Sequence, residues 1–267
     1  MVITINPFSQ LAESVSPIAI QIFVIAMIAL VIIGTLLDII HKKNVKYFFA
    51  NAKKAKLSAT REIGTSERVG VVIKTVVNDI ATTSELGAGK RRVAHILGMY
   101  GTILFWIAST VMIFCYTSNS SDTPNVWPIM WHVGAIMTCI GGYWFWFFLR
   151  VDVLAEAHPW YRIIKADLFV LALLACATFG LAWSYTQSLN LNNRWDDKLF
   201  LILFIISNLV LFGGVYWSKF AHMFYKPGAA IQKNLAEADG SRDNLPPPAD
   251  APEQFGLGIK REEPKHY

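Results

Sequence analysis

Two histidines lie where long apolar stretches of the chain meet clusters of cations, and histidines in such places can bind a metal. His95 stands at the start of the apolar stretch 93–117, and His222 stands just after the last one, 199–220. If both stretches cross a membrane as helices, the two imidazoles lie at one depth on different helices. A b-type haem needs this arrangement, because its iron takes neutral imidazoles from two helices. We therefore expect His95 and His222 to be the axial ligands of one haem iron.

The cations beside these histidines suit a haem, because its propionates are anionic. Arg91 and Arg92 precede His95, and Lys219 precedes His222. Their side chains would neutralise the propionates. In the alternative interpretation, both histidines are interfacial residues that are hydrogen-bonded to lipid head groups or to the backbone.

The composition indicates an integral membrane protein. Of the 267 residues, 54% are hydrophobic and only 16% are charged, which is more apolar than a soluble domain of this length requires. Several apolar stretches are each close to the ~20 residues that cross a bilayer as a helix. They are 18–40, 93–117, 128–149, 168–186 and 199–220. The predicted fold is therefore an all-α bundle of five transmembrane helices.

The distribution of cations predicts the orientation of this bundle. All of the 24 Lys and Arg residues except Arg194 and Lys198 lie on the side that holds the loop 41–92 and the carboxyl terminus. The positive-inside rule then places the amino terminus outside and the carboxyl terminus in the cytoplasm. This topology accounts for the net charge of +5, so no nucleic-acid partner is needed to explain the basic loops.

The predicted bundle leaves three parts of the chain. Residues 1–17 form an outer segment, residues 18–226 form the membrane domain with a cytoplasmic loop at 41–92, and residues 227–267 form a polar, Pro-rich tail. We expect this tail to be extended or disordered until something binds it. Within the loop, apolar residues over 69–80 recur at helical spacing and predict an amphipathic helix. We expect its apolar stripe to pack on the membrane domain or the bilayer surface. A docking face for a partner subunit is the alternative.

Four further residues are candidates for proton or quinone chemistry. His132 lies within the span 128–149 and His158 lies in the loop after it, and each can carry protons. The cytoplasmic end of the same span is rich in aromatic residues, among which Trp144 and Trp146 could wall a quinone ring. An aromatic belt at the membrane interface is the alternative explanation of these residues.

The cysteines suggest no metal site of their own. Cys115, Cys139 and Cys176 fall in three different spans, and the chain has no CxxC pair. We therefore expect buried thiols, without a zinc or iron–sulfur site.

The residues around the two histidines resemble the nitrate reductase gamma subunit superfamily of b-type cytochromes. The matching motifs are Arg92-x-x-His95-x-x-x-Met99-x-Gly101 and Ser218-Lys219-Phe220-Ala221-His222-Met223. Members of that superfamily hold two haems, with two histidines from each of two helices. Here Phe105, Trp106 and Phe204 stand in the outer half of these helices, without histidine counterparts. The resemblance therefore implies a single haem on the cytoplasmic side.

Within that superfamily, the chain most resembles the small membrane anchor associated with adenylylsulfate reductase in sulfur-oxidising bacteria. The resemblance implies a multi-pass subunit of the bacterial cytoplasmic membrane that passes electrons between this soluble enzyme and the quinone pool. Because the chain has no residues for flavin or iron–sulfur chemistry, the partner must supply it. A cofactor-free anchor that tethers the same enzyme is the alternative. We expect quinone to react in the cytoplasmic half, near the aromatic end of the span 128–149.

Overall fold

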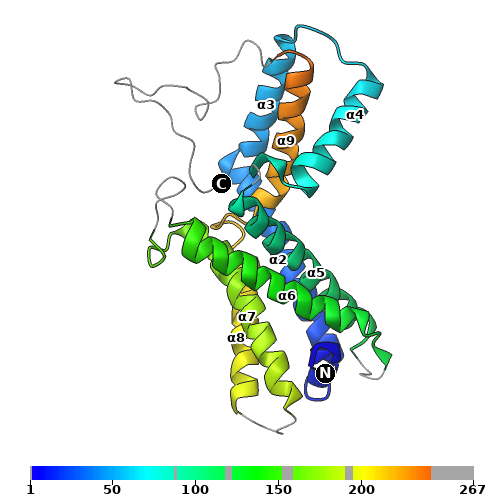
Figure 1. Ribbon diagram of the computed structural model, residues 1–267, viewed down its shortest axis with the longest axis vertical. Helices are drawn as coiled ribbons and strands as arrows, with labels where there is room; N and C mark the ends of the chain where they lie inside the picture. The colour runs from blue at the N-terminus through cyan, green and yellow to red at the C-terminus, as the bar shows by residue number, and fades with distance from the viewer. Residues whose placement is uncertain (1, 87–88, 118–121, 152–158, 190–194, 242–267) are drawn as a thin grey trace.

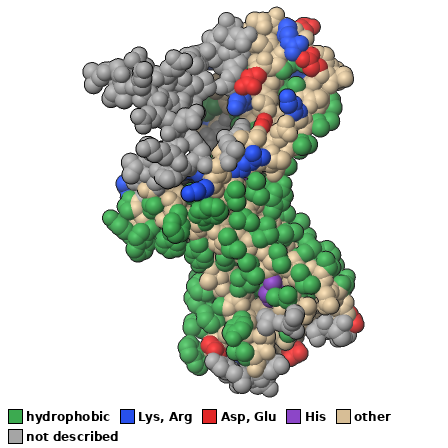
Figure 2. Space-filling view, viewed as in Figure 1, with side chains coloured by type: hydrophobic (Ala, Val, Ile, Leu, Met, Phe, Trp, Pro, Cys, Tyr) green, Lys and Arg blue, Asp and Glu red, His purple; other side chains and the backbone are tan. Residues whose placement is uncertain are grey.

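Long helices form the lower part of the molecule (Figure 1). The computed structural model describes residues 2–86, 89–117, 122–151, 159–189 and 195–241, and every regular element in these ranges is helical. The long helices are α2 (Pro17–Lys42), α5 (Lys90–Cys115), α6 (Val126–Trp144), α7 (Leu168–Ser188) and α8 (Trp195–Gly213). Hydrophobic side chains cover this lower part (Figure 2). These features confirm an all-α membrane protein.

Among the residues that the structure describes, four helices are long and apolar enough to cross a membrane. They are α2, α5, α6 extended by a π-helical turn to Leu149, and α7 together with the short turn from Lys165 that precedes it. The predicted fifth span, 199–220, is not one continuous helix in the structure, because α8 ends at Gly213 and residues 214–221 form turns. The first turn of α8 is also charged, with Asp196 and Asp197. A fifth crossing and the orientation of the bundle therefore stay predictions.

The backbones of α5 and α6 are in direct contact. A Cβ atom on Gly101 would lie 2.7 Å from the carbonyl oxygen of Gly134, and one on Gly141 would lie 2.5 Å from that of Ala94. Real side chains do not approach a backbone so closely, so these positions accept only glycine without a shift. Small residues at such crossings are how helices pack tightly in lipid. The contact fixes the first turns of α5, which carry His95, against the end of α6.

Three shorter helices form the upper part of the molecule in Figure 1. They are α3 (Asn44–Leu57), α4 (Thr65–Thr75) and α9 (His222–Ala238). Lys and Arg side chains are visible over this part in Figure 2, and we call it the basic unit. The expectation of an extended tail from residue 227 is therefore wrong up to residue 238, because α9 continues through Pro227. Residues 242–267 of the predicted tail lie outside the described residues.

Polar contacts hold α9 in the basic unit. The side-chain amide of Asn234 donates to the hydroxyl of Thr75 at 2.8 Å and to the carboxylate of Asp79 at 2.6 Å. The backbone N–H of Thr60 donates to the carbonyl of Asp239, at 3.0 Å, just after α9. The partners of α9 lie in the loop 41–92, far away in the sequence, which explains why a pattern within the tail does not reveal them.

The predicted amphipathic helix over 69–80 is present as α4 and the π-helical turn Val76–Ala81 that follows it. Its apolar stripe is not buried against another described helix. Val69 and Ile73 are 52% and 58% exposed. The stripe therefore remains open to a bilayer surface or to a partner, and which of these covers it stays a prediction.

The segment 2–17, which precedes most of α2 and was predicted to lie outside, is anchored in the bundle. Asn6 caps the short helix α1 (Pro7–Leu11), where its side-chain oxygen accepts from the N–H of Phe8 at 3.0 Å. The ring of Phe8 packs edge-on against Trp131 and Trp183, with ring centres 6.0 and 5.7 Å away. This segment therefore closes the end of the bundle that lies opposite the basic unit.

The contact between α5 and α6 predicts a large difference between two glycine replacements. In Gly134→Ala the new methyl group would meet the backbone nitrogen of Phe105 at 2.6 Å, and we expect a loss of roughly 1–3 kcal/mol in the free energy of unfolding. Gly98→Ala meets no atom within 4 Å and should be neutral or stabilising by up to ~1 kcal/mol. Denaturation of both variants in detergent measures the difference, and equal midpoints would contradict this packing.

Candidate functional site

The structure brings His95 and His222 to the same end of the bundle. His95 lies in the second turn of α5, and His222 is the first residue of α9, directly after the turns that follow α8. Both rings are partly buried, and His222 and Lys226 lie close enough to His95 to act on it electrostatically. The two histidines that the sequence selected are therefore neighbours in space, although 127 positions separate His95 from His222 in the printed sequence.

The surroundings of His222 favour a neutral ring with one nitrogen available. Its Nδ1 atom is hydrogen-bonded to the carbonyl of Lys219. A carbonyl only accepts, so Nδ1 carries the proton and Nε2 keeps its lone pair. Burial lowers the pKa of His222, and the charges of Lys226 and Lys219 lower it further, against the opposing effect of the backbone hydrogen bond. A neutral imidazole held by a carbonyl is how metal-binding histidines are usually oriented.

His95 has an unused polar atom. Its Nδ1 atom is buried and has no hydrogen-bond partner among the described residues. A buried nitrogen without a partner normally costs about 1–3 kcal/mol, so such an atom calls for a ligand or an ordered water. The donor set at this place, two imidazoles from two elements, fits a b-type haem. Among the described residues, no cluster of three or more His, Cys, Asp or Glu side chains offers another metal site.

Aromatic side chains occupy the space beside the histidines. Phe220 is 1% exposed, and its ring stacks on that of Trp106 with centres 6.1 Å apart. Phe169 meets Phe220 edge-on at 5.4 Å and His222 at 5.6 Å. Phe212 completes the group at 6.0 Å from Phe220. A haem between the histidines therefore requires the turns 214–221, which carry Phe220, to move.

The three predicted propionate partners lie in different surroundings. Arg92 donates from Nε to the carbonyl of Thr82 at 2.8 Å, which ties the start of α5 to the preceding loop. Arg91 is partly buried, whereas Lys219 is exposed. All three lie at the end of the bundle that holds the two histidines.

The half of the bundle away from the two histidines is filled by aromatic rings. Phe105 lies 5.1 Å from Trp131, and Phe204 stacks on Trp183 at 5.7 Å. Both tryptophans are fully buried. The phenylalanines that stand in place of outer ligands thus belong to a packed core.

His132 is held by hydrogen bonds at both of its ring nitrogens. Its Nδ1 atom donates to the carbonyl of Pro128 at 2.7 Å, so its Nε2 atom accepts from the hydroxyl of Ser184 at 2.8 Å. The side chain is 3% exposed and links α6 to α7. A proton relay through His132 would have to break one of these bonds. The other candidate carrier, His158, lies outside the described residues.

The aromatic end of α6 is covered by a buried ion pair. The guanidinium of Arg150 lies 4.2 Å from the ring centre of Trp146 and donates to the carboxylate of Asp167 at 2.5 Å. Trp146 is 4% exposed, and Trp144 is partly buried. The ring of Trp146 therefore serves as a platform for Arg150, and that face is not open to a quinone.

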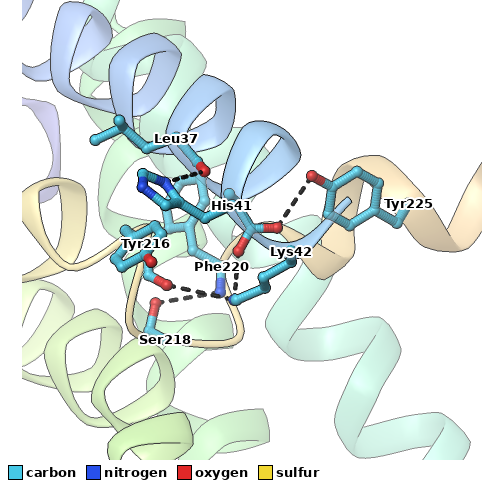
Figure 3. Close-up of polar contacts among 8 residues, drawn as sticks. Leu37, His41, Lys42, Tyr216, Ser218, Phe220 and Tyr225 are labelled. Atoms are coloured by element: carbon cyan, nitrogen blue, oxygen red, sulfur yellow. Dashed lines mark hydrogen bonds and ion pairs between the residues drawn. The ribbon is translucent and has the colours of Figure 1, made fainter. Parts of the chain in front are cut away.

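A second polar cluster, which the sequence interpretation did not include, lies beside His222. The carboxylate of Asp38 is 1% exposed, accepts from the hydroxyl of Tyr225 at 3.1 Å and forms an ion pair with Lys42. In Figure 3, the side chain of Lys42 comes from α2 and that of Tyr225 comes from α9. Burial, with the hydrogen bond to Asp38, raises the pKa of Tyr225 to about 12. Asp38 is the single charged residue in the stretch 18–40, which is a signal of function in a membrane span.

A cavity of about 300 Å³ lies at this cluster and is open to the surface. Its walls come from the end of α2, the turns after α8 and the start of α9. The lining residues are Asp38, Lys42, Ser218, Ala221, His222, Tyr225, Lys226 and Ala229. His222 therefore lines this cavity and is also a neighbour of His95.

Comparison with known proteins does not assign a function to the chain. No family model, no curated protein and no solved structure matches the chain.

The ion pair at the end of α6 yields a stability prediction. Arg150→Gln leaves the carboxylate of Asp167 buried without its cation, so we expect a loss of roughly 3–5 kcal/mol in the free energy of unfolding. Arg162 is a matched control, because its side chain is exposed and only its backbone carbonyl accepts from Arg150, at 2.7 Å. Arg162→Gln should change stability by no more than ~0.5 kcal/mol. Equal denaturation midpoints for the two variants would contradict the importance of the pair.

Proposed function

We propose that this chain is a membrane subunit that carries electrons between a soluble cytoplasmic redox enzyme and the quinone pool through one b-type haem. The observation that supports it is the meeting of His95 and His222 at one end of the bundle, with the Nδ1 atom of His95 buried and unpartnered among the described residues. Two imidazoles from separate elements are what a bis-histidine haem requires.

The residues of the chain would hold and orient such a group. Bound between the histidines, a haem supplies one-electron transfer. The carbonyl of Lys219 keeps His222 in the tautomer that presents Nε2. Arg91, Arg92 and Lys219 would pair with the propionates. Because Phe220 fills space beside His222, the turns 214–221 are the part of the chain that would adapt.

The basic unit would receive the soluble partner. Its helix α3 exposes Lys46, Lys53, Lys54 and Lys56, and α4 exposes its apolar stripe. A basic face beside an apolar one suits an enzyme with an acidic, partly apolar docking surface. The resemblance of the motifs makes an adenylylsulfate reductase-like enzyme of sulfur metabolism the proposed partner. The proposed location is the bacterial cytoplasmic membrane, with the amino terminus outside and the basic unit in the cytoplasm.

A cofactor-free anchor is the second candidate. The close packing of Phe220 against Trp106 and Phe169 favours it, because these rings leave the end of the bundle filled without any cofactor. In that case the chain tethers the soluble enzyme, and His95 and His222 have only a structural role.

A spectroscopic experiment on the purified chain distinguishes the two functions. If it carries a haem, reduced-minus-oxidised spectra show b-type bands, and His95→Ala and His222→Ala each remove them. His41→Ala is the control, because the exposed ring of His41 is bonded through Nδ1 to the carbonyl of Leu37, at 3.0 Å, and should leave the bands unchanged. A folded protein that is produced with haem available and shows no bands would establish the anchor instead.

Docking through the basic unit predicts a salt-dependent interaction. Replacement of Lys53, Lys54 and Lys56 by Glu should weaken binding of the soluble enzyme at least tenfold at low ionic strength, because like charges then face the acidic partner. The difference should shrink as salt rises, since exposed charges are screened. Lys198→Glu, at the opposite end of the bundle, is the control. Binding that is unchanged by the triple replacement would place the docking surface elsewhere.

A further inference from the structure

We propose that the cavity between the end of α2 and the start of α9 binds the head group of a membrane quinone. The inference rests on the proposed function, which makes the quinone pool the electron partner of this chain. It assigns the quinone to a set of residues that the sequence interpretation had not selected, around Asp38 and Tyr225.

The size and position of the cavity fit one head group. Its volume of about 300 Å³ lies at the small end of ligand pockets, which hold roughly 300–1,000 Å³. It is open to the surface and lies at the end of the apolar span α2. An isoprenoid tail would run along the apolar outside of this span. The ring would thus enter from the lipid, with its polar end at the cavity.

The polar groups of the cavity match both redox forms of the ligand. The ammonium groups of Lys42 and Lys226 can donate to the carbonyl oxygens of a quinone. The carboxylate of Asp38, which already accepts from Tyr225, can accept from the hydroxyl of a quinol. A site that offers donors and an acceptor together can hold a head group before and after it is reduced.

One of these groups, the carboxylate of Asp38, disfavours a lipid phosphate, whereas the ammonium of Lys226 would attract it. The charge of Lys42 is matched by Asp38, whose carboxylate is 1% exposed within the wall of the cavity. An anion that entered would lie against this carboxylate and be repelled, because like charges at close range interact strongly away from water. A neutral head group meets no such penalty.

The position relative to the histidine pair also supports this assignment. His222, one of the two proposed haem ligands, lines the cavity, so the head group would lie next to the electron carrier. At the aromatic end of α6, where quinone was expected, the ring of Trp146 is covered by Arg150, whose guanidinium lies 4.2 Å from the ring centre. The predicted quinone site therefore moves from α6 to the junction of α2 and α9.

Photo-crosslinking of the full chain in lipid nanodiscs tests the proposal. An azido-ubiquinone should label peptides that contain Lys42 or Tyr225, as mapped by mass spectrometry. Tyr225→Phe and Lys226→Gln should each lower this labelling roughly tenfold or more, since each removes a polar partner of the head group or of Asp38. Tyr143→Phe is the matched control, because it removes a hydroxyl bonded to Thr178 at 2.8 Å, far from the cavity wall, and should leave labelling unchanged.

Different results of this experiment would refute the quinone site and the proposed function. Labelling beside Trp146 or His132 would overturn the site. Labelling that is insensitive to both cavity variants would also overturn it, as would its displacement by phosphatidylglycerol, which would make the cavity a lipid head-group site. The b-type bands are read from the same samples. Labelling at Tyr225 without bands supports the site and refutes the haem, whereas bands without labelling at Lys42 or Tyr225 refute the site alone.

Discussion

Without side chains at Gly101, Gly134 and Gly141, the backbones of α5 and α6 touch, and the rest of the bundle is arranged around that contact. In lipid, helices gain little from burying apolar surface against each other, so close van der Waals contact has to hold them. Similar small residues recur at the next interfaces. A Cβ atom on Gly142 would lie 2.5 Å from Leu174 of α7, and one on Gly34 of α2 would lie 2.8 Å from Val215.

The helices themselves could be predicted, because long apolar stretches bounded by charges admit few other structures in a membrane. The end of α8 could not. Val215, Tyr216 and Trp217 continue the apolar stretch up to Ser218 and Lys219, yet the chain turns after Gly213, and an average over hydropathy does not reveal this break. The polar composition after Pro227 suggested an extended tail, but Asn234 finds its partners in α4 and in the turn that follows it. Such long-range contacts decide structure where local pattern is weak.

Only part of the candidate site could be predicted from the sequence. His95 and His222 stand out because cations flank them at the ends of apolar stretches. The pairing of Asp38 with Tyr225 joins residues 187 positions apart, and nothing in the spacing of either residue indicates the other. Likewise, an aromatic cluster in a sequence does not reveal which ring is covered, and Trp146 is covered by Arg150.

The anchoring of Phe8 between Trp131 and Trp183 has a consequence for the order in which the protein assembles. Phe8 is synthesised well before Trp183, which lies near the end of α7. The amino-terminal segment therefore has to wait, undocked, until α6 and α7 have been inserted into the membrane. Its docking joins an early part of the chain to helices that are made later, so this end of the bundle closes only after α7 is in place.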